Sequence, residues 1–382
     1  MAKRPVFEEV LDPAASSRPV TRTGMIDAAP KGARRAIRIW LMILFVMVAA
    51  MIALGGATRL TGSGLSIVEW APVTGTIPPM SQPEWQAEFE AYKTIPQYVE
   101  VNPDMDLAGF KQIYWWEWSH RLLGRLVGLV WAAGFVFFLA TKRIPTGWTP
   151  RLLGLGALGG AQGAIGWWMV SSGLTDGMTR VASYRLATHL GLAFVILGLI
   201  TWYAALLGRS EADLLRARRA SEAKLFSMST GLMHLAFVQI LIGALVAGID
   251  AGRTYTGWPT MGGEWIPALI WDPALGWRNL FENPALVQFT HRMVGYLLAI
   301  FAVVVVLRAR KSPHPVTRGA FTAMIAGVAV QVGLGIMNVI HASPLPLALA
   351  HQIGAIALFA LIIRARHHAR YPHETSVRGT IR

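Results

Sequence analysis

The chain contains no cysteine among its 382 residues, and charged residues make up only 15% of it. Without cysteine the protein has no disulfides, no thiolate metal ligands and no cysteine nucleophile. Hydrophobic residues account for 54% of the chain and the mean hydropathy is +0.44. Both values lie outside the range of a soluble globular domain, so the composition predicts a multi-span membrane protein.

Acidic residues are scarce relative to basic ones: 21 Asp and Glu against 35 Lys and Arg give a formal charge of +14. Such a charge suits a nucleic-acid partner, but the basic residues are gathered in short segments between apolar runs. The preference of cytoplasmic loops for Lys and Arg explains this distribution, so we expect membrane lipid and no nucleic acid around the protein. The first 35 residues lack the apolar core of a cleavable signal, and we interpret them as a disordered cytoplasmic tail.

Eight segments have the roughly 20 mainly apolar residues that a helix needs to cross a bilayer. They are 37–57, 121–141, 152–172, 186–207, 226–248, 290–308, 319–340 and 345–364. The connectors that follow the even-numbered spans are rich in Lys and Arg and should be cytoplasmic, as should both termini. The long segments 59–119 and 249–289 should lie outside. We therefore predict an all-α integral protein of the bacterial inner membrane with eight transmembrane helices.

The two halves of the chain carry the same motifs in the same order. His-Arg-x-x-Gly opens the second and sixth spans, Gln-x-x-x-Gly lies in the third and seventh, and a histidine stands near the start of the fourth and eighth. This order indicates two pseudo-symmetric four-helix bundles that insert in the same direction, a parallel repeat. The predicted parts are a tail at 1–36, a bundle at 37–207 with its large external segment 59–119, a linker at 208–225, a bundle at 226–364 and a tail at 365–382.

Four histidines lie near the external ends of the spans that run inward: His120, His189, His291 and His351. Each half supplies one pair from two helices, the arrangement in which bundles hold cofactors. A hydrogen bond to backbone would explain any one of them, but four in register favour metal ligation. A closed zinc site usually has four ligands, whereas a haem takes two axial ones. We therefore expect a haem in each half, near the periplasmic face.

The residues around these histidines suit a porphyrin. Gly124 and Gly295, one turn after the first histidine of each pair, would let a flat ring approach the backbone. Arg121 and Arg292 are expected to pair with haem propionates. Two further histidines outside this pattern are interpreted as structural: His234 and His341.

The two halves differ beside the His-Arg motif. Glu117 precedes His120 by three residues, on the same helical face, whereas Gln288 holds the equivalent place in the second half. A carboxylate beside a haem suggests proton handling or control of a substrate, because an amide does not titrate; an acid that favours a helix N-terminus is the simpler alternative. The first half also has the longer external segment, which is suited to cover a substrate site.

The chain resembles the haem A synthase family of mitochondria and alphaproteobacteria. The resemblance rests on "GGATRLTGSGLS", "EFEAYKTIPQY", "FKQIYWWEWSHRLLGR", "THLG", "THRMVGY" and "LAHQIGA", which together extend over nearly the whole chain. It implies oxidation of the C8 methyl of haem O to the formyl group of haem A, which cytochrome oxidase needs. One departure is that some relatives carry a cysteine pair in an external loop, so thiol-dependent electron entry is excluded here.

The resemblance also implies roles for the histidines. His291 and His351 would ligate a haem b cofactor, while His120 and His189 would ligate the substrate haem O. Glu117 would be the functional acid, so the catalytic set would be Glu117, His120 and His189. Haem O synthase, assembly factors of cytochrome oxidase and an unidentified electron donor are the implied partners, together with a possible homo-oligomer.

Two other functions fit the four histidines. A di-haem b carrier of electrons from quinol would need the same ligands, but it has no reason to distinguish its halves as Glu117 and Gln288 do. A haem transporter or chaperone would bind haem in both halves without redox turnover.

Overall fold

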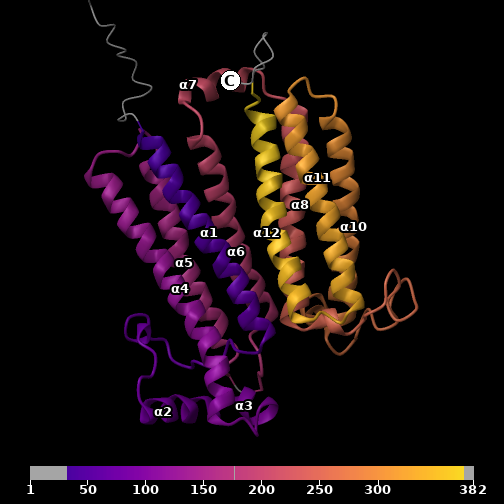
Figure 1. Cartoon of the computed structure of the whole chain (residues 1–382). Helices are drawn as coiled ribbons and strands as arrows, with labels where there is room; N and C mark the ends of the chain where they lie inside the picture. Colours follow the sequence, from indigo (N-terminus) through magenta and orange to yellow (C-terminus); the bar gives the residue numbers. More distant parts are fainter. Residues whose placement is uncertain (1–31, 176, 374–382) are drawn as a thin grey trace, which may run out of the picture.

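The computed structural model describes residues 32–373 except residue 176. Most of both predicted tails, residues 1–31 and 374–382, lies outside the described residues. The described chain forms long helices joined by short connectors and by two longer segments (Figure 1). The helices are α1 (Ala33–Leu60), α2 (Gln82–Lys93), α3 (Pro96–Val101), α4 (Leu107–Ala140), α5 (Thr149–Ser171), α6 (Ser183–Leu207), α7 (Glu211–Arg219), α8 (Ala223–Gly248), α9 (Asn279–Glu282), α10 (Pro284–Ala309), α11 (Pro315–Ile340) and α12 (Leu345–Arg370).

Seven of these helices are long and apolar enough to cross a membrane, so the chain is a multi-pass membrane protein. They are α1, α4, α6, α8, α10, α11 and α12. The remaining long helix, α5, has 23 residues and is rich in glycine and tryptophan, residues that contribute little to hydropathy. The all-helical prediction is confirmed, and the crossing by α5 stays a prediction.

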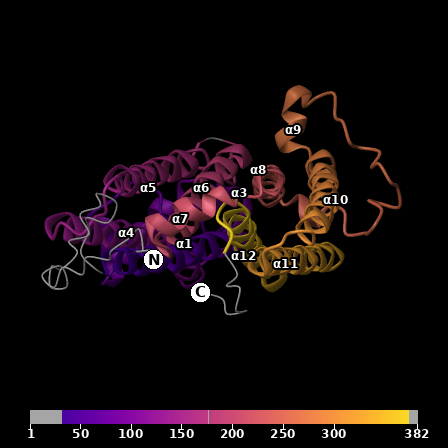
Figure 2. The same cartoon turned by 90° about the horizontal axis from the view of Figure 1, so that it is seen from above.

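The long helices pack in two groups, α1, α4, α5 and α6 in one and α8, α10, α11 and α12 in the other (Figures 1 and 2). Helix α1 packs on α4 and α6 as α8 packs on α10 and α12, and α5 joins α4 to α6 as α11 joins α10 to α12. The two groups meet where α1 and α6 lie against α8 and α12. The duplication itself stays a prediction from the sequence.

Both groups are oriented the same way along the bundle. The start of α1, the end of α12 and the short helix α7 lie at one end, whereas α2, α3 and the segment between α8 and α10 lie at the other (Figure 1). The chain thus enters α4, α6, α10 and α12 from the end that carries the two long connecting segments (Figure 1). Each of the four histidines is in the first half of one of these helices.

Helix α4 is longer than the span predicted at 121–141. Asp106 caps its first turn by accepting a hydrogen bond from the backbone nitrogen of Gly109 at 2.8 Å, and the helix then runs for 34 residues. Residues 107–119, which the sequence places in the external segment, are therefore helical and continuous with the span. They pack against α2 through an aromatic cluster of their own: Trp85, Phe89, Tyr92, Phe110 and Tyr114.

A glutamine forms a polar contact between the two groups inside the bundle. Gln352 on α12 donates from Nε2 to the carbonyl oxygen of Ile52 on α1 at 2.7 Å. A Cβ added at Gly56 would lie only 1.7 Å from Oε1 of Gln352, so α12 approaches α1 where α1 has no side chain.

Candidate haem sites

The four predicted histidines form two pairs, each within one group of helices. His120 on α4 and His189 on α6 are close enough for an electrostatic interaction, as are His291 on α10 and His351 on α12. All four rings are partly buried. A glycine of a neighbouring helix faces each ring: Gly55 faces His120, Gly166 faces His189, Gly243 faces His291 and Gly335 faces His351.

In three of the four histidines, the side chain of a glutamine on a neighbouring helix packs against the imidazole ring. In each case the amide nitrogen donates to the histidine's own carbonyl oxygen at 2.8–2.9 Å. The same nitrogen lies 3.2–3.5 Å from both ring nitrogens, so it stands over the ring face rather than in the ring plane. The pairs are Gln162 with His189, Gln239 with His291 and Gln331 with His351.

This arrangement fits axial ligation of a haem. Because each amide approaches the ring face, the in-plane lone pair of the imidazole remains available to a metal. The carbonyl oxygens of the three glutamines are buried without a hydrogen-bond partner in the described chain. Among the described residues no three His, Asp or Glu side chains cluster to hold a metal ion, whereas an axial pair needs only two.

The two glycines predicted to admit a porphyrin face neighbouring helices of their own bundle. A Cβ at Gly124 would lie 3.5 Å from Cε of Met51, and one at Gly295 would lie 3.2 Å from Nε2 of Gln239. Both positions therefore adjoin the residues around the histidines. Their contact with a porphyrin stays a prediction.

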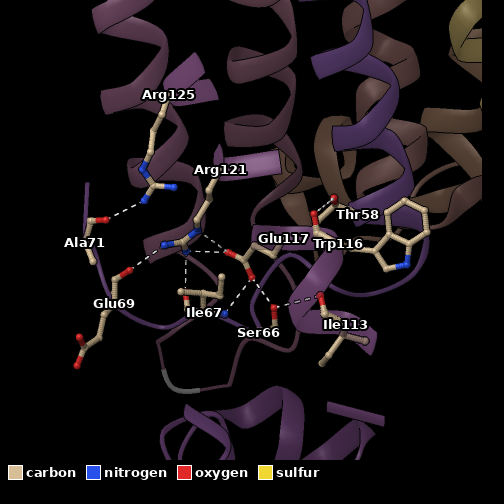
Figure 3. Close-up of polar contacts among 10 residues, drawn as sticks. All are labelled: Thr58, Ser66, Ile67, Glu69, Ala71, Ile113, Trp116, Glu117, Arg121 and Arg125. Carbon is tan, nitrogen blue, oxygen red and sulfur yellow. Dashed lines mark hydrogen bonds and ion pairs between the residues drawn. The ribbon is translucent and has the colours of Figure 1, made fainter. Parts of the chain in front are cut away.

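Glu117 and Arg121 hold part of the segment between α1 and α4 against α4, and we call this contact the charged clasp (Figure 3). Glu117 is 3% exposed. Its Oε2 accepts from the Ser66 hydroxyl at 2.8 Å and from the Ile67 backbone nitrogen at 2.9 Å. Its Oε1 accepts from Nε and Nη2 of Arg121 at 3.1 and 2.7 Å. The carboxylate therefore has four donors around it.

The guanidinium of Arg121 also binds backbone. It donates to the carbonyl oxygens of Ile67 at 2.6 Å and Glu69 at 2.8 Å, and Arg125, one turn further, binds that of Ala71 at 2.8 Å (Figure 3). Arg125 also binds the carbonyl oxygen of Pro72 at 2.8 Å. Residues 66–72 thus lie along α4. Pairing of Arg121 with a propionate stays a prediction, as Nε, Nη1 and Nη2 each already have an acceptor.

The second half has an equivalent contact, which we call the neutral clasp because the amide of Gln288 stands where the charged clasp has a carboxylate. Arg292 donates to the carbonyl oxygens of Tyr255 and Gly257 at 2.9 Å and of Thr260 at 3.2 Å. Gln288 donates to the same Tyr255 carbonyl at 2.9 Å, and its own Oε1 is buried without a partner in the described chain. Pairing of Arg292 with a propionate likewise stays a prediction.

A second acid lies near the charged clasp. Burial raises the pKa of Glu88 on α2, the Glu69 carboxylate raises it further, and Arg121 acts in the opposite direction. Arg121 is therefore close to more negative charge than that of Glu117 alone. Glu88 was not expected from the sequence, because nothing in its local pattern links α2 to α4.

The two histidines that the sequence indicates to be structural have local partners. His234 and His341 each bind the carbonyl oxygen four residues earlier at 2.8 Å, that of Thr230 and of Met337. Gln239 was not predicted from the sequence, although the signal is present: Gln239-x-x-x-Gly243 is a third copy of the motif found at Gln162 and Gln331.

Comparison with known proteins gives one consistent result. Residues 38–363 match the sequence profile of the family described as "Cytochrome oxidase assembly protein". "Heme A synthase" of Paracoccus denitrificans (strain Pd 1222) is 80% identical over 384 residues, covering 100% of both chains. The proteins of the same name from Ruegeria sp. (strain TM1040) and Roseobacter denitrificans are 59% and 58% identical, each over 99% of this chain and 100% of the relative.

Proposed function

The chain belongs to the family of cytochrome oxidase assembly proteins, and from this premise we propose that it is a haem A synthase that oxidises the C8 methyl of haem O to a formyl group. The observation that carries the proposal is the presence of two histidine pairs, one in each group of helices, of which only one adjoins a buried carboxylate among the described residues. The reaction makes the protein an oxidoreductase acting on a CH group.

His291 and His351 are proposed to hold haem b, and His120 and His189 to hold haem O. The assignment is supported by the difference between the clasps, because the larger external segment and the ion pair belong to the half of His120. When bound, haem b supplies one-electron transfer. The methyl would be hydroxylated twice, and the resulting hydrate would lose water to give the aldehyde.

The chain's own residues have positioning roles in this proposal. Gln162, Gln239 and Gln331 orient the imidazole rings that they cover. Glu117 keeps residues 66 and 67 next to α4, one turn before His120, and so helps to close the external side of the substrate site. In the clasp both carboxylate oxygens of Glu117 accept two hydrogen bonds each. Proton transfer through Glu117 would therefore require a hydrogen bond from Ser66 or Arg121 to break.

We place the protein in the bacterial inner membrane with eight spans, including α5, and with α2 and α3 on the periplasmic side. The basic connectors that follow α4, α6, α10 and α12 support this orientation. Haem O synthase, oxidase assembly factors and an electron donor are the proposed partners.

Acid–acetone extraction and chromatography of the haem bound to the purified protein, produced with a source of haem O, test the function. We expect haem B with haem O, its hydroxylated product and haem A. His291→Ala should lose haem B, whereas the matched control His234→Ala should keep it, because His234 binds only a backbone carbonyl. Haem B alone, unchanged by Glu117→Ala despite ample haem O, would instead identify a di-haem electron carrier.

A further inference from the structure

His120 is the one histidine of the four without a glutamine on its ring in the described chain. The other three lie beside helices that carry Gln-x-x-x-Gly, in which the glutamine covers the ring and the glycine lies behind it. Helix α1, which lies beside His120, carries Met51-x-x-x-Gly55 instead. Methionine has no hydrogen to donate, so it makes no equivalent bond to the carbonyl of His120.

Met51 occupies the place of the missing glutamine. Its Cε lies 3.5 Å from where a Cβ of Gly124 would be, as Nε2 of Gln239 lies 3.2 Å from the corresponding point of Gly295. The two side chains are similar in length and unbranched, so Met51 fills the same space. The difference between the halves at this position is therefore one of hydrogen bonding rather than of volume.

The ring of His120 also faces its glycine differently. Behind the three glutamine-bound rings, Cε1 is the nearest atom to the added Cβ, at 2.8 Å for His189 and 3.1 Å for His291 and His351. For His120 the nearest atom is Nε2, at 3.0 Å, and Cε1 is 3.9 Å away. The unbound ring is thus turned relative to the other three, which is an observation independent of the missing amide.

We propose that His120 is the exchangeable axial ligand of the substrate haem and that Met51 is the positioning residue that leaves it free to exchange. The proposal rests on the proposed function, in that it takes the His120–His189 pair to hold haem. In the exchange, Nε2 of His120 would leave the iron with both electrons of the bond, so that no oxidation or reduction would accompany the step. A small neutral diatomic ligand could then take the place of His120, while the other three histidines would stay bound.

Carbon monoxide is a suitable probe, because it binds ferrous haem only where an axial position is free or easily freed. It is titrated into the reduced, haem-loaded full-length protein, and the spin state of the oxidised protein is recorded by electron paramagnetic resonance. We expect about one carbon monoxide per two haems, since one of four ligands exchanges. His291→Ala, which removes the haem of the second half, assigns the binding to the first half.

Met51→Gln is the decisive variant, since it installs the missing amide. One hydrogen bond of ordinary strength should lower carbon monoxide affinity on the order of tenfold, with unchanged haem content and a larger low-spin fraction. Met51→Leu is the matched control and should bind carbon monoxide as the unaltered protein does. Unchanged affinity in Met51→Gln at full haem content would overturn the proposal.

The reciprocal variant Gln239→Met removes the amide from His291 and decides the question even if Met51→Gln does not fold. The second haem should then begin to bind carbon monoxide, and an unchanged stoichiometry would count against the proposal. The two hypotheses fail separately. Haem A formation with carbon monoxide binding insensitive to Met51 would refute the proposal for His120 and Met51 and leave the synthase function standing. The expected binding pattern without any oxidised haem would refute only the synthase function.

Discussion

The charged clasp of the first half and the neutral clasp of the second hold equivalent loops with different chemistry. Both use the arginine of the His-Arg motif to bind backbone carbonyls of the external segment. In the first half the arginine is also paired with a buried carboxylate that has four donors, whereas in the second the amide Gln288 leaves an oxygen without a partner in the described chain. Both arginines make charge-assisted bonds, but only the first loop also bonds to a carboxylate, and those bonds are stronger than the neutral bond that Gln288 donates in the second. The tighter fixation belongs to the half in which we place the reaction.

Replacing Glu117 by glutamine should have the largest effect on this difference. The variant gives the first half the side chain of the second, but it leaves Arg121 without its counter-ion in a site where its side chain is only 17% exposed. Breaking a buried pair in this way costs about 3–5 kcal/mol, so the thermal midpoint in detergent should fall markedly. Haem A formation should be largely lost while haem B is retained, which extraction measures. A variant as stable and active as the unaltered protein would show that the ion pair is dispensable.

The opposite exchange, Gln288→Glu, should have a smaller effect. The new carboxylate would stand four residues before Arg292 and could pair with it, but the bond that Gln288 donates to the Tyr255 carbonyl would be lost. Loss of one hydrogen bond against gain of one pair predicts a net change in stability of about 1 kcal/mol. Haem A formation should change little, and thermal unfolding beside Glu117→Gln measures the contrast. If the two variants lose equal stability, the clasps are energetically equivalent.

The smallest effect is expected at the ion pairs that join the two groups of helices at Asp250. Asp250 Oδ2 accepts from Arg59 at 3.3 Å and from Arg180 at 2.6 Å; the side chains of Asp250 and Arg180 are 30% and 46% exposed, and that of Arg59 is 17% exposed. Because exposed pairs contribute at most about 1 kcal/mol, Asp250→Asn should lower the thermal midpoint only slightly and less at high salt. Asparagine tolerates the positive φ of 55° found here, so Asp250→Ala, which does not, separates backbone strain from charge. A loss that is large and independent of salt would contradict this explanation.

The sequence predicted the helices better than it predicted their ends or partners. The apolar runs are long enough to require helices in lipid, so their existence followed from composition. The start of α4 did not, because the cap at Asp106 lies fifteen residues before the predicted span begins at residue 121. The partners of Glu117 were unpredictable for another reason. Ser66 and Ile67 are about 50 residues away along the chain, and no periodicity links them to α4.

The histidine pairs were predictable because each motif occurs twice, and repetition identified four positions at once. Met51 was not, since a methionine in an apolar helix carries no signal of its own. Its role becomes visible only when it is compared with Gln162, Gln239 and Gln331, which requires knowing which helix faces each histidine. The approach of α12 to α1 at Gly56 likewise depends on packing between distant parts of the chain.

Gly55 and Gly56 are adjacent on α1 but serve different halves. The first lies against the ring of His120, and the second lies against Gln352, the neighbour of His351 in the other pair. One dipeptide therefore sets how closely α1 approaches both sites. A shift of α1 along its axis would change the packing around both sites at once. The position of this dipeptide would therefore affect the distance over which an electron would tunnel between them.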